Sequence, residues 1–412
     1  MNSDPKNPTT TTTTTTSFKS LENKIEFEME NEFIILKFEK NEKKIFELKR
    51  IYNKFLKKWI NIKNEILEYT GLGSGAYIFF PKSDANLISI ESNFIETKFF
   101  DNTLISEFQQ RINKNITKIY RIFKKSQNTE VCIFFELDII SNSIGEDKEL
   151  ITRFSSNEIE SNGKFYTDEN GFEIIEREYK KKFSDKKRSE IISSNYYPHV
   201  SQSYIKDDSI QLTVFSKQAF GVSSLFNGSI EFMINRNTLQ DDNRGVNERV
   251  KNDEISIAKF RILISSPSAS NSIRPKISQR FENPFTPFFF KGKYSKLGLK
   301  KEKLIPSFEQ FFTTTFSTLS GDFPHNVHLL SMKAMKQQPK FLSISGHAFK
   351  IIFRFQHLYE KMQDSTHSKI ERIYIDKLFP DYIFTDSHLQ SLTLNHDSKF
   401  ILLSLTNHFL FF

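Results

Sequence analysis

The sequence predicts an all-β protein, in which a large antiparallel β-sandwich is followed by a smaller C-terminal β-sandwich domain. Apolar and aromatic residues recur in runs of about five to eight residues, several of them alternating with polar residues. Polar or glycine-bearing turns separate these runs, and few helical patterns intervene. The chain has 412 residues, of which 38% are hydrophobic and 14% aromatic. This is enough to bury a large core in about two or three domains.

The first element is a polar N-terminal segment, residues 1–20, which contains an unbroken threonine run from Thr9 to Thr16. Such a segment cannot offset its ordering entropy by burial, so a disordered tail is predicted. The sequence shows neither the apolar core of a signal peptide nor an apolar stretch of about 18 residues. It therefore predicts no membrane span, and a cytoplasmic location by default.

Residues 21–300 form the predicted central sandwich domain. Short apolar runs at 24–29 and 33–38 predict strands, whereas apolar residues at three- and four-residue steps predict a helix over 45–60. The further predicted strands are 76–80, 118–123, 132–137, 211–215, 228–234 and 260–264. Cys132, the only cysteine, is expected to be a core residue; one cysteine permits no intrachain disulfide and no thiolate zinc site.

The C-terminal part is predicted to begin with a linker. The serine-rich stretch 265–272 has the composition of a linker, and the weakly periodic segment 301–325 is assigned as the linker between the two domains. Residues 326–412 form the predicted C-terminal β domain, from a strand near 326–330 to a last one at 400–403.

The loop at 239–246 is the strongest candidate functional segment. It follows the predicted strand 228–234 and presents Asp241, Asp242, Arg244 and Gly245. Carboxylates accept hydrogen bonds and a guanidinium donates them in a fixed fork, which suits recognition of sugar hydroxyls. An ordinary surface turn with an ion pair has the same composition, so both interpretations stay open. In an extended chain the adjacent acids diverge, so they are predicted to bind Arg244 and backbone amides structurally, not to form a hydrolytic pair.

Several other site classes are not supported. The glycine-dense stretch 71–75 precedes a predicted strand instead of opening a helix, which predicts a loop and not a phosphate site. His325 and His328 lie close in sequence but lack the further ligands that zinc requires. The net charge of +8 is spread over lysines mixed with glutamates, which indicates a solvated surface and not a nucleic-acid interface. Asn115 and Asn227 begin glycosylation sequons, which decide nothing without a signal sequence.

Taken together and in order, several segments resemble the C-terminal β region of glycoside hydrolase family 38, the α-mannosidases of the lysosome or vacuole and the Golgi. The matching stretches are 74–79, 151–154, 163–171, 195–198, 211–214, 241–246, 326–330, 378–379 and 392–395. They cover residues 25–400 and look closest to the lysosomal branch. The resemblance implies that the larger sandwich is galactose-mutarotase-like.

The resemblance also implies roles for individual residues. In whole enzymes of the family, this region packs against a zinc-bearing N-terminal barrel and completes the wall of its active site. The residues that match Tyr77 and Arg244 lie near the bound mannose there, so these two are expected to bind substrate. Asp241, Asp242 and Gly245 are expected to shape the loop. No catalytic residue, metal ligand or cofactor is expected in this chain, because the zinc ligands and the nucleophile of the family have no counterpart in it.

Three functions follow from this resemblance. The chain is expected to be an α-mannosidase-like non-catalytic region that binds mannose-containing glycans and hydrolyses nothing alone. Alternatively, it hydrolyses α-mannosides when another chain supplies the zinc-bearing barrel, or it is a stand-alone carbohydrate-binding module or pseudoenzyme from a truncated paralogue. The expected partners are glycans and a barrel-bearing mannosidase chain; the resemblance favours the lysosome or vacuole. One departure from the family pattern is Arg236-Asn237-Thr238-Leu239, where a second arginine is usual.

Overall fold

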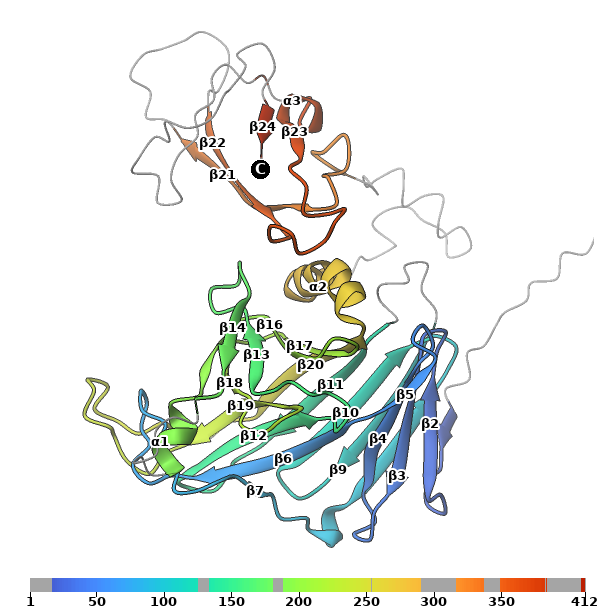
Figure 1. The fold of residues 1–412 in the computed structure, drawn as a ribbon, viewed down its shortest axis with the longest axis vertical. Coiled ribbons are helices and arrows are strands. Elements are labelled where there is room, and N and C mark those ends of the chain that lie inside the picture. Colours follow the sequence, from blue (N-terminus) through green and yellow to red (C-terminus); the bar gives the residue numbers. More distant parts are fainter. Residues whose placement is uncertain are drawn as a thin grey trace, which may run out of the picture. The chain divides into compact units, whose positions relative to one another are not determined.

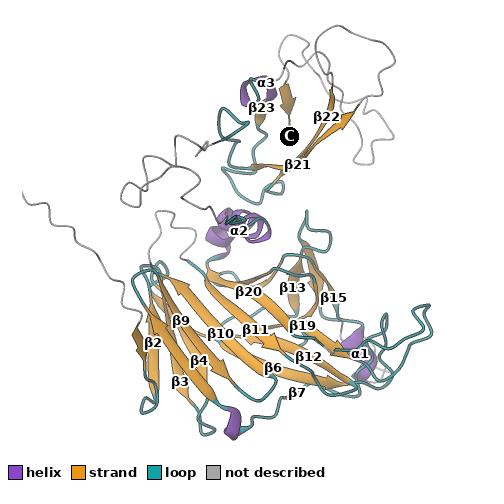
Figure 2. Cartoon of the chain, turned by 180° about the vertical axis from the view of Figure 1, so that it is seen from behind, coloured by secondary structure: helices purple, strands orange, loops and turns teal. Residues whose placement is uncertain are grey.

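The chain divides into two compact units, Met1–Asn283 and Pro284–Phe412. The computed structural model describes residues 17–124, 133–180, 188–252, 254–289, 316–336, 349–381, 383 and 409–411. Almost all regular structure in these residues is β-strand (Figures 1 and 2).

The first unit contains three sheets, and their strand pairs are antiparallel, which confirms the predicted all-β class. The ten-stranded sheet has the order β1 (Ser17–Lys19), β8 (Glu96–Asp101), β9 (Ile105–Arg111), β10 (Ile116–Phe123), β11 (Phe135–Ser141), β20 (Ser256–Ser265), β17 (Gln211–Ser216), β16 (Gln202–Lys206), β13 (Lys164–Thr167) and β14 (Ile175–Glu178). The six-stranded sheet has the order β15 (Tyr197–His199), β18 (Phe220–Ser223), β19 (Ser229–Asn237), β12 (Lys148–Ser155), β6 (Lys63–Thr70) and β7 (Asn86–Leu87). The four-stranded sheet consists of β2 (Glu26–Glu30), β3 (Ile34–Lys40), β4 (Phe46–Asn53) and β5 (Lys58–Asn61).

One continuous apolar core joins the inner faces of the three sheets. Strands such as β2 and β9 bury every second residue, which is the period-two pattern of a sheet with one solvated face. Phenylalanine fills much of this core. The ring of Phe27 stacks on Phe38 at 4.8 Å and meets Phe108 edge-on at 4.8 Å between centroids. Such aromatic pairs add to the stabilisation from buried area.

The helix predicted over 45–60 is wrong, because this segment forms the hairpin of β4 and β5. The pairing of β3 with β4 contains a register shift between Lys37 and Phe38. On β4 the buried positions therefore move from Phe46 and Leu48 to Ile51 and Asn53. A bulge thus inserts a three-residue step into a period-two pattern, and that step imitates helical spacing.

Two other expectations are corrected, and four predicted strands are confirmed. Residues 76–80 form an irregular loop, not a strand. The serine-rich stretch 265–272 mostly belongs to a helix, α2 (Pro267–Glu282), which begins with Ser266 accepting a hydrogen bond from the backbone N–H of Ala269 at 3.3 Å. Predicted strands at 118–123, 211–215, 228–234 and 260–264 lie in β10, β17, β19 and β20. Cys132 lies outside the described residues, and the strand predicted around it begins at Phe135.

The second unit has two strand pairs: β21 (Val327–Lys336) with β22 (Phe349–His357), and β23 (Arg372–Tyr374) with β24 (Phe409–Phe411). The short helix α3 (Ile375–Leu378) follows β23. Asn326, from the motif at 326–330, is buried and donates to the carbonyl oxygens of His367 at 2.9 Å and Lys369 at 3.1 Å. Asn326 therefore stabilises the loop that follows β22. The stretches 392–395 and 400–403 lie outside the described residues.

His199 is a fully buried imidazole at the end of β15. Its Nδ1 lies 2.7 Å from the hydroxyl of Ser203 and its Nε2 lies 2.6 Å from that of Ser216. Burial lowers the pKa of His199 to about 3. Below the ordinary histidine pKa of about 6.5, the unfolded chain therefore binds a proton that the folded chain does not.

We expect the free energy of unfolding to fall by about 2 kcal/mol from pH 7.5 to pH 5 through His199 alone. Denaturant titrations at both pH values check this, because His199→Gln removes that part of the pH dependence. Histidine hydrogen–deuterium exchange, followed by mass spectrometry, gives a second measurement on the unaltered chain. Titration of His199 near pH 6.5 in the folded protein would contradict the expectation.

Candidate functional site

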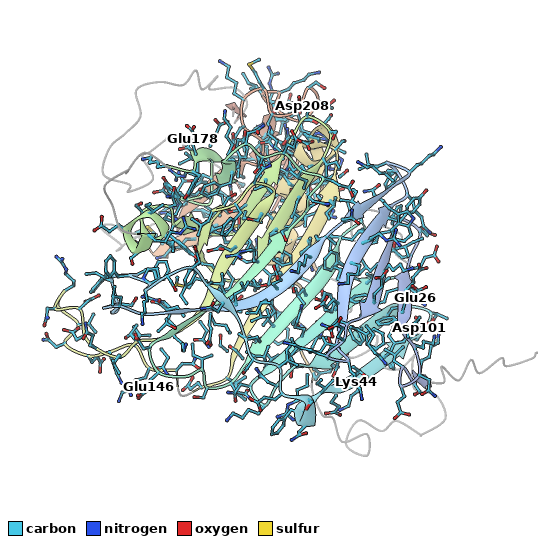
Figure 3. All side chains as sticks on the ribbon, turned by 60° about the horizontal axis from the view of Figure 1, so that its bottom comes forward. Glu26, Lys44, Asp101, Glu146, Glu178 and Asp208 are labelled. Carbon is cyan, nitrogen blue, oxygen red and sulfur yellow. The ribbon has the colours of Figure 1, made fainter. Side chains whose placement is uncertain are left out.

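Three loops meet beyond the same strand ends of the six-stranded sheet, a region called the three-loop edge: 71–85 after β6, 142–147 before β12, and 238–252 after β19. They meet because β12 runs antiparallel to both β6 and β19, so that Lys148 lies opposite Thr70 and Asn237. The backbone N–H of Gly71 donates to the carbonyl oxygen of Asp147 at 3.0 Å. Glu146 projects from the second loop (Figure 3) and forms an ion pair of 2.8 Å with Arg249 of the third.

Residues 71–81 form a folded-back loop that displays Tyr77. The backbone N–H of Gly75 donates to the carbonyl oxygen of Ile78 at 2.9 Å, and that of Phe80 donates to the hydroxyl of Ser74 at 2.9 Å. The ring of Phe79 packs inward against the aromatic residues of the sheet. Tyr77 points the other way and is 68% exposed. The loop is therefore anchored on one side and offers a phenol on the other.

Asp242 holds this loop by its N–H groups. Its Oδ2 accepts hydrogen bonds from the backbone N–H of Tyr77 at 2.6 Å and of Ile78 at 2.9 Å. Desolvation alone would raise the pKa of Asp242, but these donors outweigh it and lower the pKa. A Cβ on Gly75 would lie only 2.4 Å from the Cβ of Asp242, so only glycine permits this close approach.

Arg236, at the end of β19, holds the same loop by its carbonyl groups. Its guanidinium donates to the carbonyl oxygens of Ile78 at 2.9 Å and Ala76 at 3.3 Å. It also donates to Oε1 of Glu149 at 2.7 Å. Glu149 is 1% exposed, and this burial raises its pKa despite the hydrogen bonds from Arg236. The Ala76–Ile78 backbone is thus held through its N–H groups by Asp242 and through its carbonyl oxygens by Arg236.

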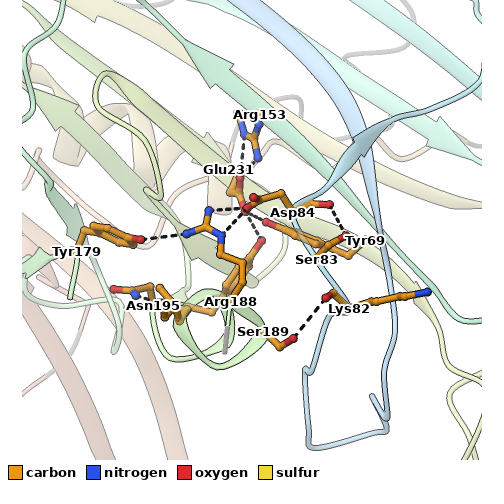
Figure 4. Close-up of polar contacts among 12 residues, drawn as sticks. Tyr69, Lys82, Ser83, Asp84, Arg153, Tyr179, Arg188, Ser189, Asn195 and Glu231 are labelled. Atoms are coloured by element: carbon orange, nitrogen blue, oxygen red, sulfur yellow. Dashed lines mark hydrogen bonds and ion pairs between the residues drawn. The ribbon is translucent and has the colours of Figure 1, made fainter. Parts of the chain in front are cut away.

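A second buried ion pair lies farther along the same two strands (Figure 4). Oε2 of Glu231 accepts from the guanidinium of Arg153 at 2.6 and 2.8 Å, while Oε1 accepts the hydroxyls of Tyr69 at 2.7 Å and Tyr196 at 2.6 Å. Burial, followed by the negative charge of Glu231, raises the pKa of both tyrosines. The rings of Tyr69 and Tyr196 lie 5.3 and 4.9 Å from that of Phe79, so this pair supports the loop from below.

The helix α1 (Arg188–Ser193) fixes the remaining end of the loop. Arg188 donates from Nε to the carboxylate of Asp84 at 2.9 Å and from Nη1 to the hydroxyl of Tyr179 at 3.2 Å (Figure 4). Together with the hydrogen bonds that Asp242 and Arg236 form with the loop, this contact pre-organises the segment that carries Tyr77.

The structure brings Tyr77 and Asp242 into direct contact, while Arg244 lies farther along the same loop and is exposed. Gly245 has a φ of 106°, which the tight turn requires. Asp241 accepts from the backbone N–H of Asn243 at 2.9 Å. In the structure both acids accept hydrogen bonds from backbone amides. The predicted binding of Arg244 by these acids is not seen, because neither forms an ion pair with its guanidinium among the described residues.

The sequence did not reveal Arg236 and Glu149 as supports of the site. Arg236 was noticeable only as part of a departure from the family pattern. The missing signal is the register of β12 with β19, which sets Glu149 opposite Arg236 and Arg153 opposite Glu231. Such cross-strand pairing depends on which strands are neighbours, and sequence spacing does not give that.

In the part of the chain that the structure describes, no group of three or more His, Cys, Asp or Glu side chains is placed to hold a metal ion. These described residues therefore do not offer the three or four convergent ligands that a zinc site needs. Over the same described residues, no helix is long and apolar enough to cross a membrane.

The family model and the sequence relatives indicate one family. The model of the glycosyl hydrolases family 38 C-terminal domain matches residues 29–244. Alpha-mannosidase C of Dictyostelium discoideum is 29% identical over 64% of this chain and 23% of its own length. Lysosomal alpha-mannosidase of Felis catus is 29% identical over 78% of this chain and 30% of its own length.

The chain therefore spans less than a third of the length of these relatives. An alpha-mannosidase structure from Enterococcus faecalis V583 aligns with a TM-score of 0.47 and 16% identity, covering 63% of this chain and 31% of the other. The family model spans more than half of the sequence and confirms the resemblance: the chain belongs to glycoside hydrolase family 38, whose C-terminal domain it contains.

Proposed function

We propose that the three-loop edge of the six-stranded sheet is one wall of a mannoside-binding site, and that the chain acts as the non-catalytic C-terminal region of an α-mannosidase. The observation that supports this most is that two side chains, Asp242 and Arg236, hold the backbone of Ala76–Ile78. Asp242 and Arg236 use a buried ion pair and a glycine-only contact to hold a backbone whose Tyr77 side chain is left exposed. A rigid aromatic with a hydroxyl binds a sugar at low entropic cost.

Arg244 supplies the complementary polar contact. Its side chain is exposed on a loop bent by Asn243, with a φ of 56°, and Gly245. A guanidinium donates in a fork to oxygen acceptors, which suits neighbouring hydroxyls on a pyranose ring. Tyr77 and Arg244 are accordingly the proposed sugar contacts, and Asp241, Asp242 and Gly245 shape the loops.

Hydrolysis of α-mannosides is proposed to need catalytic carboxylates and zinc from a barrel-bearing mannosidase region. The loops support such a partner surface, because Leu72, Leu239 and Val246, which lie on the same two loops as Tyr77 and Arg244, are 54%, 56% and 38% exposed. Exposed apolar side chains are typical of interaction surfaces where they are contiguous. The lysosomal relative makes the lysosome or vacuole the proposed compartment.

Isothermal titration with mannose and an α-mannobiose tests the proposed site. Arg244→Ala and Tyr77→Ala are each expected to weaken binding about tenfold, through loss of roughly 1.4 kcal/mol of binding free energy. Arg50→Ala is the control, because Arg50 packs on Trp59 in the four-stranded sheet. No heat at millimolar sugar, or equal binding by all variants, would overturn the proposal. Turnover of a chromogenic α-mannoside by the 412-residue chain alone would overturn its non-catalytic part.

A further inference from the structure

The turn between β18 and β19 holds the second sequon in a defined orientation. Asn227 is exposed, and its Oδ1 accepts from the backbone N–H of Asn162 at 3.0 Å and from the hydroxyl of Ser161 at 3.2 Å. A backbone N–H can only donate, so the atom that faces it must be the oxygen of the amide. Nδ2 consequently faces away, and it has no hydrogen-bond partner among the described residues.

Gly228 fixes this orientation. Its φ is 65°, and a Cβ there would lie 2.2 Å from the carbonyl oxygen of Ser156 and 2.7 Å from that of Ile159. Its N–H donates to the Ser161 hydroxyl at 3.1 Å, and its carbonyl oxygen accepts from the Ser156 N–H at 2.9 Å. The turn is therefore pinned to the 156–161 loop, and Asn227 stands on a rigid base.

Phe226, the residue before Asn227, exposes an apolar surface in the same turn. Its side chain is 44% exposed, and the guanidinium carbon of Arg153 lies 5.0 Å from its ring centroid. Arg153 covers one side of the ring, and part of the remaining aromatic surface is exposed. The C–H face of a sugar attached at Asn227 can pack on that surface.

We propose that Asn227 is an N-glycosylation site whose first N-acetylglucosamine packs on Phe226. Nδ2 attacks C1 of the sugar in a polyprenyl-diphosphate-linked oligosaccharide. The N–C1 bond forms, the C1–O bond to phosphate breaks, and the lipid diphosphate leaves with that electron pair. Nδ2 loses one proton to solvent, and nothing is oxidised or reduced.

The burial of Ser229 indicates that the transfer takes place before the chain has folded. Its side chain is 4% exposed, and its hydroxyl donates to the carbonyl oxygen of Phe226 at 2.9 Å. A transferase reads the hydroxyl of the sequon together with the amide, so it must act before β19 joins the sheet. The folded chain is not a substrate, whereas the folded product accommodates the glycan at an exposed turn.

The test expresses the full 412-residue chain behind a cleavable secretion signal in a eukaryotic host. Peptide mass spectrometry after endoglycosidase treatment is expected to find the remaining N-acetylglucosamine on Asn227. Asn227→Gln is expected to lose this modified peptide, whereas Asn115→Gln, in the other sequon, keeps the glycan on Asn227. An unmodified Asn227 in the secreted wild-type chain would overturn the site. Modification of purified folded chain by transferase and lipid-linked donor would overturn the assigned timing.

A second measurement tests the contact with Phe226. The glycosylated chain is expected to melt about 2 °C above the same chain made without the glycan in a bacterial host. Phe226→Ala should remove this difference while leaving Asn227 occupied. The wild-type chain and the Phe226→Ala variant are both also made in a bacterial host, which attaches no glycan, to confirm that they fold. If the glycan raises the melting temperature equally with and without the phenyl ring, the packing on Phe226 is wrong.

Discussion

Replacing Glu231 by glutamine is expected to lower the free energy of unfolding by about 3–5 kcal/mol. The Glu231 side chain is 1% exposed and accepts hydrogen bonds from Arg153, Tyr69 and Tyr196. An amide of the same shape leaves the Arg153 guanidinium, 13% exposed, without a counter-charge. Removing one partner of a buried ion pair costs far more than the pair contributes, because the remaining charge stays desolvated. Guanidinium titration followed by the fluorescence of Trp59, the only tryptophan, measures the effect.

The matched control is Glu96→Gln. Glu96 pairs with Lys98 at 2.8 Å, but the two side chains are 55% and 54% exposed. Water and salt screen such a pair, so its loss should leave the free energy of unfolding almost unchanged. Equal effects of the two substitutions would contradict the assignment of Glu231 as a structural anchor.

The same substitution should loosen the site above the pair. Tyr69 and Tyr196 share the Oε1 acceptor of Glu231, and both rings contact Phe79 of the loop that carries Tyr77. Faster amide exchange at Tyr77 and Ile78 in the still-folded variant is the expected sign. The stability of the sheet and the order of the candidate site therefore share one carboxylate.

The fold class could be predicted because strands such as β2 and β9 bury every second residue, which leaves a period-two pattern in the sequence. Other strands, such as β17, are buried along their whole length and appear as short apolar runs. The errors have local causes. The bulge on the β3–β4 pair changed the spacing of buried residues and imitated a helix. The serines that begin α2 look like a linker, although Ser266 is an N-cap and Pro267 suits the first turn of a helix.

The candidate site could be predicted only in part. Tyr77, Asp242 and Arg244 lie in motifs that match the family, but the sequence predicts a strand around Tyr77, whereas that residue lies in a loop. That the loops meet depends on the pairing of β6, β12 and β19, which no local pattern encodes. For the same reason Arg236 had no visible partner, since Glu149 lies on a different strand and faces it only in the folded sheet.

Arg236→Ala is expected to cost about 3–5 kcal/mol of unfolding free energy at pH 7.5 and clearly less at pH 5. The substitution leaves Glu149 buried without its positive partner. Burial already raises the pKa of Glu149, and loss of Arg236 removes a contact that lowers it. As the pH falls toward 5, the folded state takes up a proton on Glu149 more readily than the unfolded state, so stability recovers. Denaturant titration at the two pH values measures the difference.

Glu149→Gln/Arg236→Ala is the control that isolates the charge. With a neutral side chain at 149, the cost of losing Arg236 should be smaller and the same at both pH values, because hydrogen bonds are lost but no titratable group is left buried without its partner. Mannoside binding by this double variant should be weaker than that of the unaltered chain, because Tyr77 is intact but Arg236 no longer holds its backbone. Full binding by the double variant would show that Arg236 does not position Tyr77. A cost for Arg236→Ala that does not change with pH would show that Glu149 is not the group left unpaired.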